Sequence, residues 1–243
     1  MTIYSALQIG EYHTNHCEDY YFIGNIGSDK TLCAVMDGCT MGTDSYFIAT
    51  LAGKLLRKIT LERDYQAFYK TELVTDINQY LKSIVKDLFR ELNITANQLM
   101  LDKRELLTTL ILLLVDRKAD EGIILAVGDG LVSVNRQITV FDHDNKSDYI
   151  GFHLTEDFEA WYDKQPQKLL FNKIEDVSIA TDGISLFARI RNNDEEAIDP
   201  VSFLLSDTTL SDKEDMLQLK LKALEHQFGL KPGDDIAIVR LIM

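Results

Sequence analysis

Acidic residues recur at the ends of short apolar runs, and this recurrence constrains the fold more than any other feature. The run "LCAVM", residues 32–36, ends in Asp37-Gly38, and the run "VSIAT", residues 177–181, ends in Asp182-Gly183. A single Asp-Gly pair is an ordinary turn. The other acidic positions that adjoin apolar runs are Glu18-Asp19, Asp129 and Asp234-Asp235.

Five such positions are hard to explain by turn formation alone. If their strands share one edge of a sheet, the carboxylates gather in one cleft and repel one another unless a cation lies between them. Hard divalent ions such as Mg²⁺ and Mn²⁺ prefer oxygen ligands of this kind. The neighbouring glycines let a backbone carbonyl approach as a further ligand. The pattern therefore favours a metal site.

The composition indicates one globular domain spanning residues 1–243. Hydrophobic residues make up 46% of the chain and charged residues 26%, and three prolines leave no obvious linker. The formal net charge of −14 argues against nucleic acid or an anionic membrane as the main partner. Three cysteines fit a reducing cytosol better than a disulfide framework.

The sequence also shows no targeting or membrane segment. The N-terminus has no signal-peptide pattern. The longest apolar run, residues 106–115, is about half as long as a membrane span. We therefore expect a soluble, cytoplasmic protein, and a monomer.

Strands are expected where short apolar runs are bounded by turn residues. The expected strands are residues 3–9, 20–26, 31–36, 107–116, 121–127, 131–134, 137–141, 177–181 and 236–242. The segment Gly128-Asp129-Gly130 is predicted to be a hairpin connection between two of them. Residues 142–175 are polar and irregular, which predicts a long surface excursion.

Three amphipathic helices are expected from apolar residues that recur every three or four positions. The first follows Thr43 as N-cap, the second spans roughly residues 76–92, and the last begins at a capping box of Ser211 and Glu214. Their apolar stripes are Phe47, Leu51, Leu55 and Ile59; Ile77, Leu81, Ile84, Leu88 and Leu92; and Leu217, Leu221, Leu224 and Phe228. Blocks of strands between helices predict an α+β fold with mostly antiparallel pairing in two sheets.

The motifs, taken in order, resemble those of the metal-dependent protein serine/threonine phosphatases of the 2C type. That family has an acidic pair near the start, a strand that ends in Asp-Gly, a Gly-Asp hairpin, a second Asp-Gly, and a final Asp-Asn or Asp-Asp. The corresponding segments here are "HCEDYY", "AVMDGCTMG", "AVGDGLV", "IATDGIS" and "GDDIAIV", from residue 16 to residue 240. Each motif alone is weak, whereas the ordered set covers nearly the whole chain.

The resemblance implies a fold, a metal centre and a reaction. The fold is a central antiparallel β-sandwich flanked by helices on both sides, and two Mn²⁺ or Mg²⁺ ions lie at one end of it. A water that bridges the two ions would attack the phosphorus of phosphoserine or phosphothreonine in a phosphorylated protein substrate. No covalent enzyme intermediate is required.

The resemblance also implies which residues hold the ions. Asp129 matches a third, looser metal position, and Asp19 would steady metal-bound water. The remaining ligands would be Asp37 as the bridge, Glu18 and the Gly38 carbonyl on one ion, and Asp182 and Asp234 on the other.

Three positions depart from the family pattern. Cys39 stands where relatives usually have a histidine that serves as general acid. An ordinary thiol has a pKa of about 8.5, so Cys39 is either a poorly matched acid or a small turn residue. Thr14 stands in place of a phosphate-binding arginine, with His13 and His16 nearby. Leu186 stands where many relatives have an acid that helps to hold the third ion.

These departures leave two alternative functions open. A pseudophosphatase would keep the fold and the metals and act as a regulatory module, although all the core carboxylates are retained here. A two-metal phosphoesterase of small molecules is the second alternative. The sequence does not separate the protein substrate from a small phosphoester.

Overall fold

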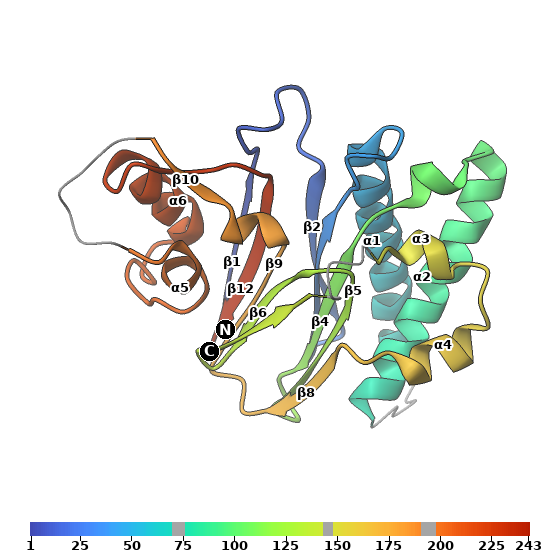
Figure 1. Ribbon diagram of the computed structural model, residues 1–243. Helices are drawn as coiled ribbons and strands as arrows, with labels where there is room; N and C mark the ends of the chain where they lie inside the picture. The colour runs from blue at the N-terminus through green and yellow to red at the C-terminus, as the bar shows by residue number, and fades with distance from the viewer. Residues whose placement is uncertain (70–75, 143–147, 191–197) are drawn as a thin grey trace.

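The computed structural model consists of two antiparallel sheets packed face to face, with helices on both outer faces (Figure 1). It describes residues 1–69, 76–142, 148–190 and 198–243. The first sheet has the order β1 (Thr2–Gln8), β12 (Ile236–Ile242), β9 (Asp176–Ala180), β6 (Gly130–Val134) and β7 (Gln137–Phe141). The second has the order β2 (Asp19–Ile26), β3 (Lys30–Asp37), β4 (Leu110–Asp116), β5 (Glu121–Val127) and β8 (Lys168–Asn172). The predicted α+β fold with a central antiparallel β-sandwich is confirmed.

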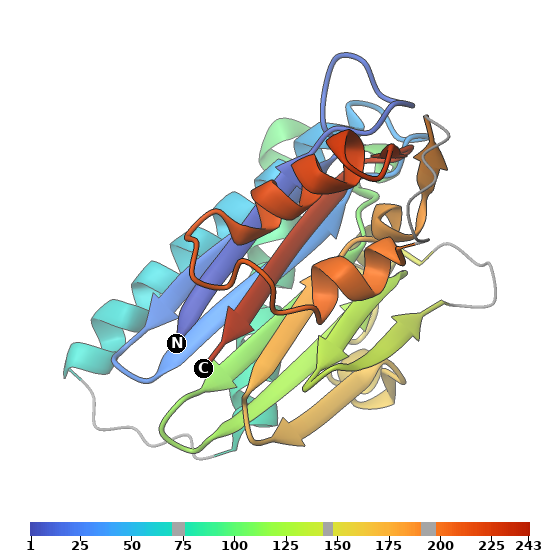
Figure 2. The same cartoon turned by 90° about the vertical axis from the view of Figure 1, so that its left-hand side faces the viewer.

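Helices cover both sheets, and Figure 2 looks onto the two that lie on the first sheet. These are α5 (Pro200–Leu205) and α6 (Met216–His226), while α1 (Ser45–Tyr69) and α2 (Ile77–Leu99) pack on the second sheet. The shorter elements are η1 (Lys103–Leu106), α3 (Ile150–His153), α4 (Phe158–Lys164), η2 (Asp182–Ser185) and the pair β10 (Phe187–Arg189) and β11 (Leu230–Pro232). Among the described residues, no helix combines the length and the hydropathy that a membrane span needs.

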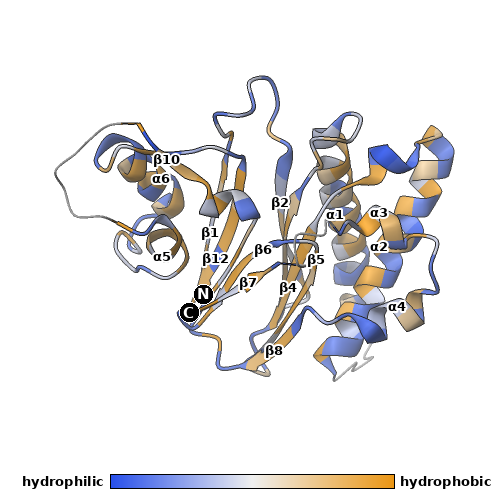
Figure 3. Ribbon diagram, viewed as in Figure 1, coloured by the Kyte–Doolittle hydropathy of each residue, from blue (hydrophilic) through white to orange (hydrophobic). Residues whose placement is uncertain are grey.

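Three apolar layers fill the spaces between helices and sheets, and the strands are correspondingly hydrophobic in Figure 3. In β3, Leu32 and Met36 lie in the layer with α1 and α2, whereas Cys33 and Val35 lie in the layer between the sheets. A strand that is buried on both faces is apolar at every position. This explains the continuous apolar runs of the sequence, and it leaves the ends of the strands as the places for charged groups.

The first predicted helix has a different start and a different buried face. It begins at Ser45, so Thr43 does not adjoin it. Ile48 lies on the buried face and Phe47 is only half-buried. The reason is the close approach of the helix to the sheet at Gly53, where an added Cβ would lie 2.4 Å from a tyrosine ring of β2. Ala49, Ala52 and Gly53 therefore share the buried face with larger residues, of which Ile59 alone belongs to the predicted stripe.

The other two helices are confirmed in part. The stripe predicted for α2 is buried, and the helix extends to Leu99 from its N-cap Asp76. The capping box is wrong, because α6 begins at Met216 and both Ser211 and Glu214 precede it.

The prediction of a surface excursion over residues 142–175 is wrong. Residues 148–175 form α3, α4 and β8, and β8 extends the second sheet. Trp161 and Tyr162 of α4 are buried, and the Trp161 ring lies 4.6 Å from that of Phe89 on α2. The aromatic residues find an apolar partner that the local sequence does not reveal. Residues 143–147 lie outside the described residues.

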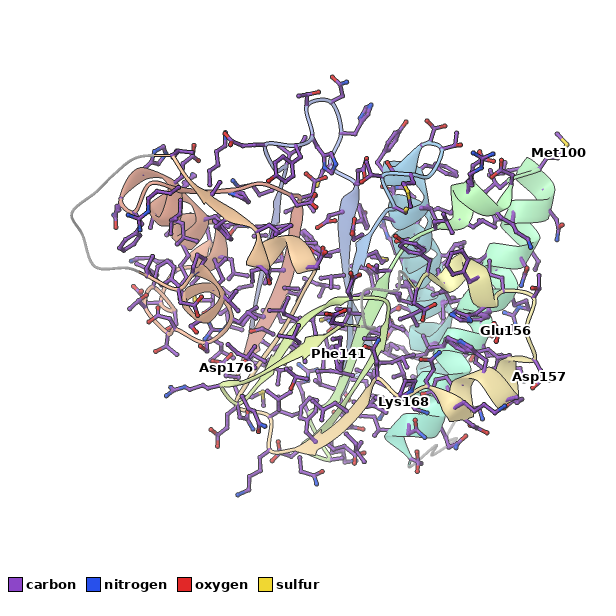
Figure 4. All side chains as sticks on the ribbon, in the orientation of Figure 1. Met100, Phe141, Glu156, Asp157, Lys168 and Asp176 are labelled. Carbon is purple, nitrogen blue, oxygen red and sulfur yellow. The ribbon has the colours of Figure 1, made fainter. Side chains whose placement is uncertain are left out.

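A buried ion pair joins β12 to β9 at the end of the sandwich where Figure 4 labels Asp176. The Arg240 guanidinium donates from Nε to Asp176 Oδ1 (2.8 Å) and from Nη2 to Asp176 Oδ2 (2.6 Å). It also donates to the carbonyl oxygens of Leu204 (3.2 Å) and Asp207 (2.7 Å). The pair thereby fixes α5 and the turn after it to the first sheet.

Asp176→Ala is expected to lower the free energy of unfolding by about 3–5 kcal/mol, because it leaves the Arg240 charge buried without a partner. Denaturant unfolding measures the loss. Asp212→Ala, which removes an exposed ion pair with Lys213, is the control and should change stability by no more than about 0.5 kcal/mol. Equal losses in the two variants would contradict the structural role of the buried pair.

Candidate metal centre

The carboxyl group of the buried Asp19 and that of the half-buried Asp37 face each other across the second sheet. The register of β2 and β3 places Asp19 directly opposite Asp37, and like charges in that position destabilise a sheet. Burial, together with the charges of Asp235 and Asp182, raises the pKa of Asp19 to about 8. Burial, Asp19 and Asp182 hold the pKa of Asp37 well above its usual value. The two carboxyl groups lie within hydrogen-bonding reach of each other.

The first sheet contributes two further carboxylates to the same end of the sandwich. Asp182 opens η2, just after β9, and Asp234 lies just before the neighbouring strand β12. Burial, followed by the charges of Asp129 and Asp234, raises the pKa of Asp182 to about 6. Asp182 and Asp234 also act on Asp37. The structure thus brings acids from both sheets together, as the recurrence in the sequence predicts.

Thr181 connects the two sheets at this end. Its hydroxyl donates to Asp19 Oδ2 (2.6 Å) and accepts from the backbone N–H of Ala237 (2.9 Å). The carboxyl group of Asp19 on one sheet is therefore held by a residue of the other. The only sequence signal for Thr181 is that it directly precedes Asp182.

Asp235 anchors the loop that carries Glu18. Its side chain is 1% exposed and accepts from the backbone N–H of Gly10 (2.7 Å) and of Glu18 (2.5 Å). From the sequence, Asp235 is an acid at the start of a strand, and only its neighbour Asp234 is predicted to bind metal. The structure gives Asp235 the separate role of fixing the β1–β2 loop.

Both Asp-Gly pairs lie where another backbone segment touches the strand end. A Cβ on Gly38 would lie 2.0 Å from the carbonyl oxygen of Ser45, and one on Gly183 would lie 1.9 Å from that of Asp235. The Gly38 N–H also donates to the carbonyl oxygen of Glu18 (3.1 Å). Only glycine fits these contacts, which hold the start of α1 and the start of β12 beside the acids.

The predicted hairpin at Gly128-Asp129-Gly130 is wrong. This segment connects β5 to β6, which belong to different sheets, so it is a crossover between the two layers of the sandwich. The same glycine-rich turn chemistry serves either connection. Asp129 nevertheless acts on the pKa of Asp182. Leu186 is 46% exposed and, as an apolar side chain, offers no ligand for a third ion.

The imidazole of His13 lies among the acids of the loop and of β12. Its Nδ1 is 2.9 Å from Asp235 Oδ2 and 3.6 Å from Asp234 Oδ1, and its Nε2 is 3.8 Å from Glu18 Oε2. Burial lowers the pKa of His13, but the hydrogen-bonding contact and charge of Asp235 and the charges of Glu18 and Asp234 raise it by more.

A pocket of about 340 Å³ opens beside Glu18. It is lined by Tyr12, His13, Thr14, Asn15, His16, Glu18, Asp44, Ser45 and Tyr46. None of these described residues is Lys or Arg. The pocket lining therefore offers no substitute for the phosphate-binding arginine whose position Thr14 occupies. Cys39 is buried and is not among the lining residues. Its role as a general acid stays a prediction.

The acids offer the oxygen ligands that a divalent ion prefers. Their side chains do not, however, point toward one common position. In the described part of the chain, no three His, Cys, Asp or Glu side chains form a group that could hold a metal ion. Glu18 Oε2, however, is buried without a hydrogen-bond partner, and burial, together with the charges of nearby acids, raises the pKa of Asp19, Asp37 and Asp182. A hard cation would relieve both conditions.

Comparisons with known proteins give a family match and a likeness of fold. The family model for protein phosphatase 2C matches residues 10–224. The chain is similar to a bacterial serine phosphatase (16% identity, TM-score 0.59, 99% of this chain and 96% of that chain). It is also similar to the serine/threonine phosphatase Stp1 from Staphylococcus aureus (16%, 0.60, 99% and 94%) and to RsbX in complex with magnesium (15%, 0.53, 97% and 92%). At these identities the likeness shows the fold. No curated protein sequence matches the chain significantly.

In excess chelator, stability is expected to fall as pH rises between about pH 4 and pH 8. Folding raises the pKa of Asp182 to about 6 and of Asp19 to about 8, so the folded protein binds more protons than the unfolded chain in this window. The stabilisation is complete below the unfolded pKa and is lost as pH passes the folded values.

Thermal unfolding in chelator at several pH values measures this slope. Asp37→Asn should flatten it, because it removes a titrating group whose own pKa is raised by burial and by the charges of Asp19 and Asp182. Added Mn²⁺ should also flatten it in the unaltered protein. A stability that rises across the same window would contradict the prediction.

Proposed function

The chain belongs to the protein phosphatase 2C family, and from this membership we propose that it hydrolyses phosphoserine and phosphothreonine in proteins with the help of two divalent ions, Mn²⁺ or Mg²⁺. One observation carries the proposal: carboxylates from both sheets gather at one end of the sandwich, with Asp19 and Asp37 facing each other in register. We retain the expectation of a single-domain, cytoplasmic monomer as part of the proposal.

Five residues would hold the two ions in this proposal. Asp37 would bridge them, Glu18 and the Gly38 carbonyl would bind one, and Asp182 and Asp234 would bind the other. Ions bound there would supply Lewis-acid activation of a water molecule and neutralisation of the phosphate dianion. Asp129, which acts on Asp182 across the crossover, is the candidate for a third, looser position.

The surrounding residues orient these groups. Thr181 donates to Oδ2 of Asp19 and so fixes the carboxyl group that would orient the attacking water. Asp235 holds the loop that carries Glu18 through two backbone N–H groups. The pocket beside Glu18 offers space for the peptide segment next to the phosphorylated residue.

The lining of this pocket also supports a second candidate function. Because no Lys or Arg is among its described residues, phosphate binding lacks the bidentate contact that a guanidinium gives. A pseudophosphatase that binds metal and acts as a regulatory module would tolerate this loss. A phosphoesterase of small molecules is the remaining alternative, and substrate comparison separates the three.

The proposed enzyme should hydrolyse an aryl phosphate and a phosphothreonine peptide with Mn²⁺ or Mg²⁺ and neither substrate in excess chelator. Asp37→Asn and Asp182→Asn should each abolish turnover with the fold retained by circular dichroism, because each removes a metal ligand. Asp212→Asn, an exposed acid of the ion pair with Lys213, is the control.

Three other results would contradict the proposed function in different ways. Activity that survives exhaustive chelation would refute the metal-dependent mechanism. Metal binding without turnover of either substrate would favour the pseudophosphatase. Turnover of small phosphate esters alone would favour the small-molecule phosphoesterase.

Cys39→Ala is expected to leave kcat on both substrates within a few-fold of the unaltered value, because the side chain is buried and does not line the pocket. Loss of a general acid would instead cost about 10²-fold or more. That cost would be confined to the phosphothreonine peptide, whose alkoxide leaving group needs a proton, whereas an aryl phenolate leaves unaided. Steady-state kinetics on both substrates measures the difference, and a large loss on the peptide alone would make the thiol the acid.

A further inference from the structure

His13 has the surroundings of a metal-binding histidine. Histidines that bind metal ions almost always donate their other ring N–H to a carboxylate or a carbonyl, which fixes the tautomer and orients the ring. Here Nδ1 lies 2.9 Å from Asp235 Oδ2. This distance is that of a hydrogen bond, although the ring is not aligned to form one in the structure.

Asp235 is held firmly enough to orient the ring. Its side chain is 1% exposed, and its two oxygens accept from the backbone N–H groups of Gly10 and Glu18. An asparagine would offer one acceptor oxygen at this position, whereas the carboxylate offers two. Oδ1 can therefore serve Gly10 while Oδ2 serves Glu18 and faces His13.

The second ring nitrogen faces an unsatisfied oxygen donor. His13 Nε2 is 3.8 Å from Glu18 Oε2, which is buried and has no hydrogen-bond partner. This separation is too long for a hydrogen bond. Two donors that each lie about 2.1 Å from one ion are roughly 3–4 Å apart, so a single ion fits between these two atoms.

We propose that His13 is a nitrogen ligand of the ion that Glu18 holds, with Asp235 as the carboxylate that orients it. The proposal rests on the two-metal function proposed above and adds a ligand to it. Mg²⁺ is a hard ion that favours a shell of oxygen donors, whereas Mn²⁺, a transition-metal ion, binds oxygen donors and also accepts an imidazole nitrogen. The mixed nitrogen and oxygen set therefore shifts the preference of this ion position from Mg²⁺ toward Mn²⁺.

Pulsed electron paramagnetic resonance of Mn²⁺ bound to the full chain tests the ligand directly. The spectrum should show coupling to a ring nitrogen, and ¹⁵N-labelled histidine should change that coupling. In His13→Ala the coupling should disappear. In the matched control His16→Ala it should persist, because His16 lies on the same loop with its ring stacked on Tyr46 at 4.3 Å.

Calorimetric titration with Mn²⁺ and with Mg²⁺ gives a second readout. His13→Ala should weaken Mn²⁺ binding by at least about 10-fold, because even the loss of a residue that only orients a ligand costs about 10- to 100-fold, and it should weaken Mg²⁺ binding by clearly less. Tighter binding of both ions in His13→Ala would overturn the inference, because His13 would then be a cation that competes with the metal.

Two results would separate the role of His13 from the two-metal function. Mn²⁺ that binds without nitrogen coupling overturns the role of His13 and leaves the two-metal phosphatase intact. A chain that binds no Mn²⁺ overturns both. The spectrum of the unaltered protein decides between these results even where His13→Ala does not fold.

Discussion

The facing pair of Asp19 and Asp37 is the constraint on which the rest of the structure depends. The backbone register of β2 and β3 sets the two carboxyl groups opposite each other, at the end of two strands whose faces are covered by apolar layers. Burial raises the pKa of both, and the charge of Asp182 raises each further. Such a pair is costly while both groups are charged, and in the proposed function a divalent cation is the partner that offsets this cost.

Neither sheet could form this centre alone. The second sheet supplies Asp19 and Asp37, and the first supplies Asp182 together with the pair that precedes β12. The hydroxyl of Thr181 and the carboxylate of Asp235 hold the two contributions together through contacts with residues far away in the sequence. The packing between the sheets therefore sets the geometry of the centre, and a change in that packing would reach the acids directly.

The sequence predicts the parts of this centre that depend on local pattern. An apolar run that ends in Asp-Gly places an acid at the end of a strand, whichever sheet the strand joins. Asp37 and Asp182 could therefore be predicted as acids at strand ends. Local pattern does not say which sheet a strand joins, which is why the crossover at Asp129 was predicted as a hairpin. It also does not show burial by a distant partner, as at Trp161. The contact between His13 and Asp235 joins the two ends of the chain, and no local signal predicts it.

In the proposed mechanism, the negative charge of the centre requires the metal ions to bind before the phosphate group. Around the pocket the described residues offer carboxylates and histidines but no Lys or Arg, so a phosphate dianion approaching without ions would meet net negative charge. In relatives with an arginine at the position of Thr14, a side chain shares the neutralisation of the phosphate. Here the ions themselves must provide it in the proposed mechanism. Phosphate binding is then conditional on metal binding, and a ligand such as His13 that strengthens the hold on one ion would also strengthen the hold on the substrate.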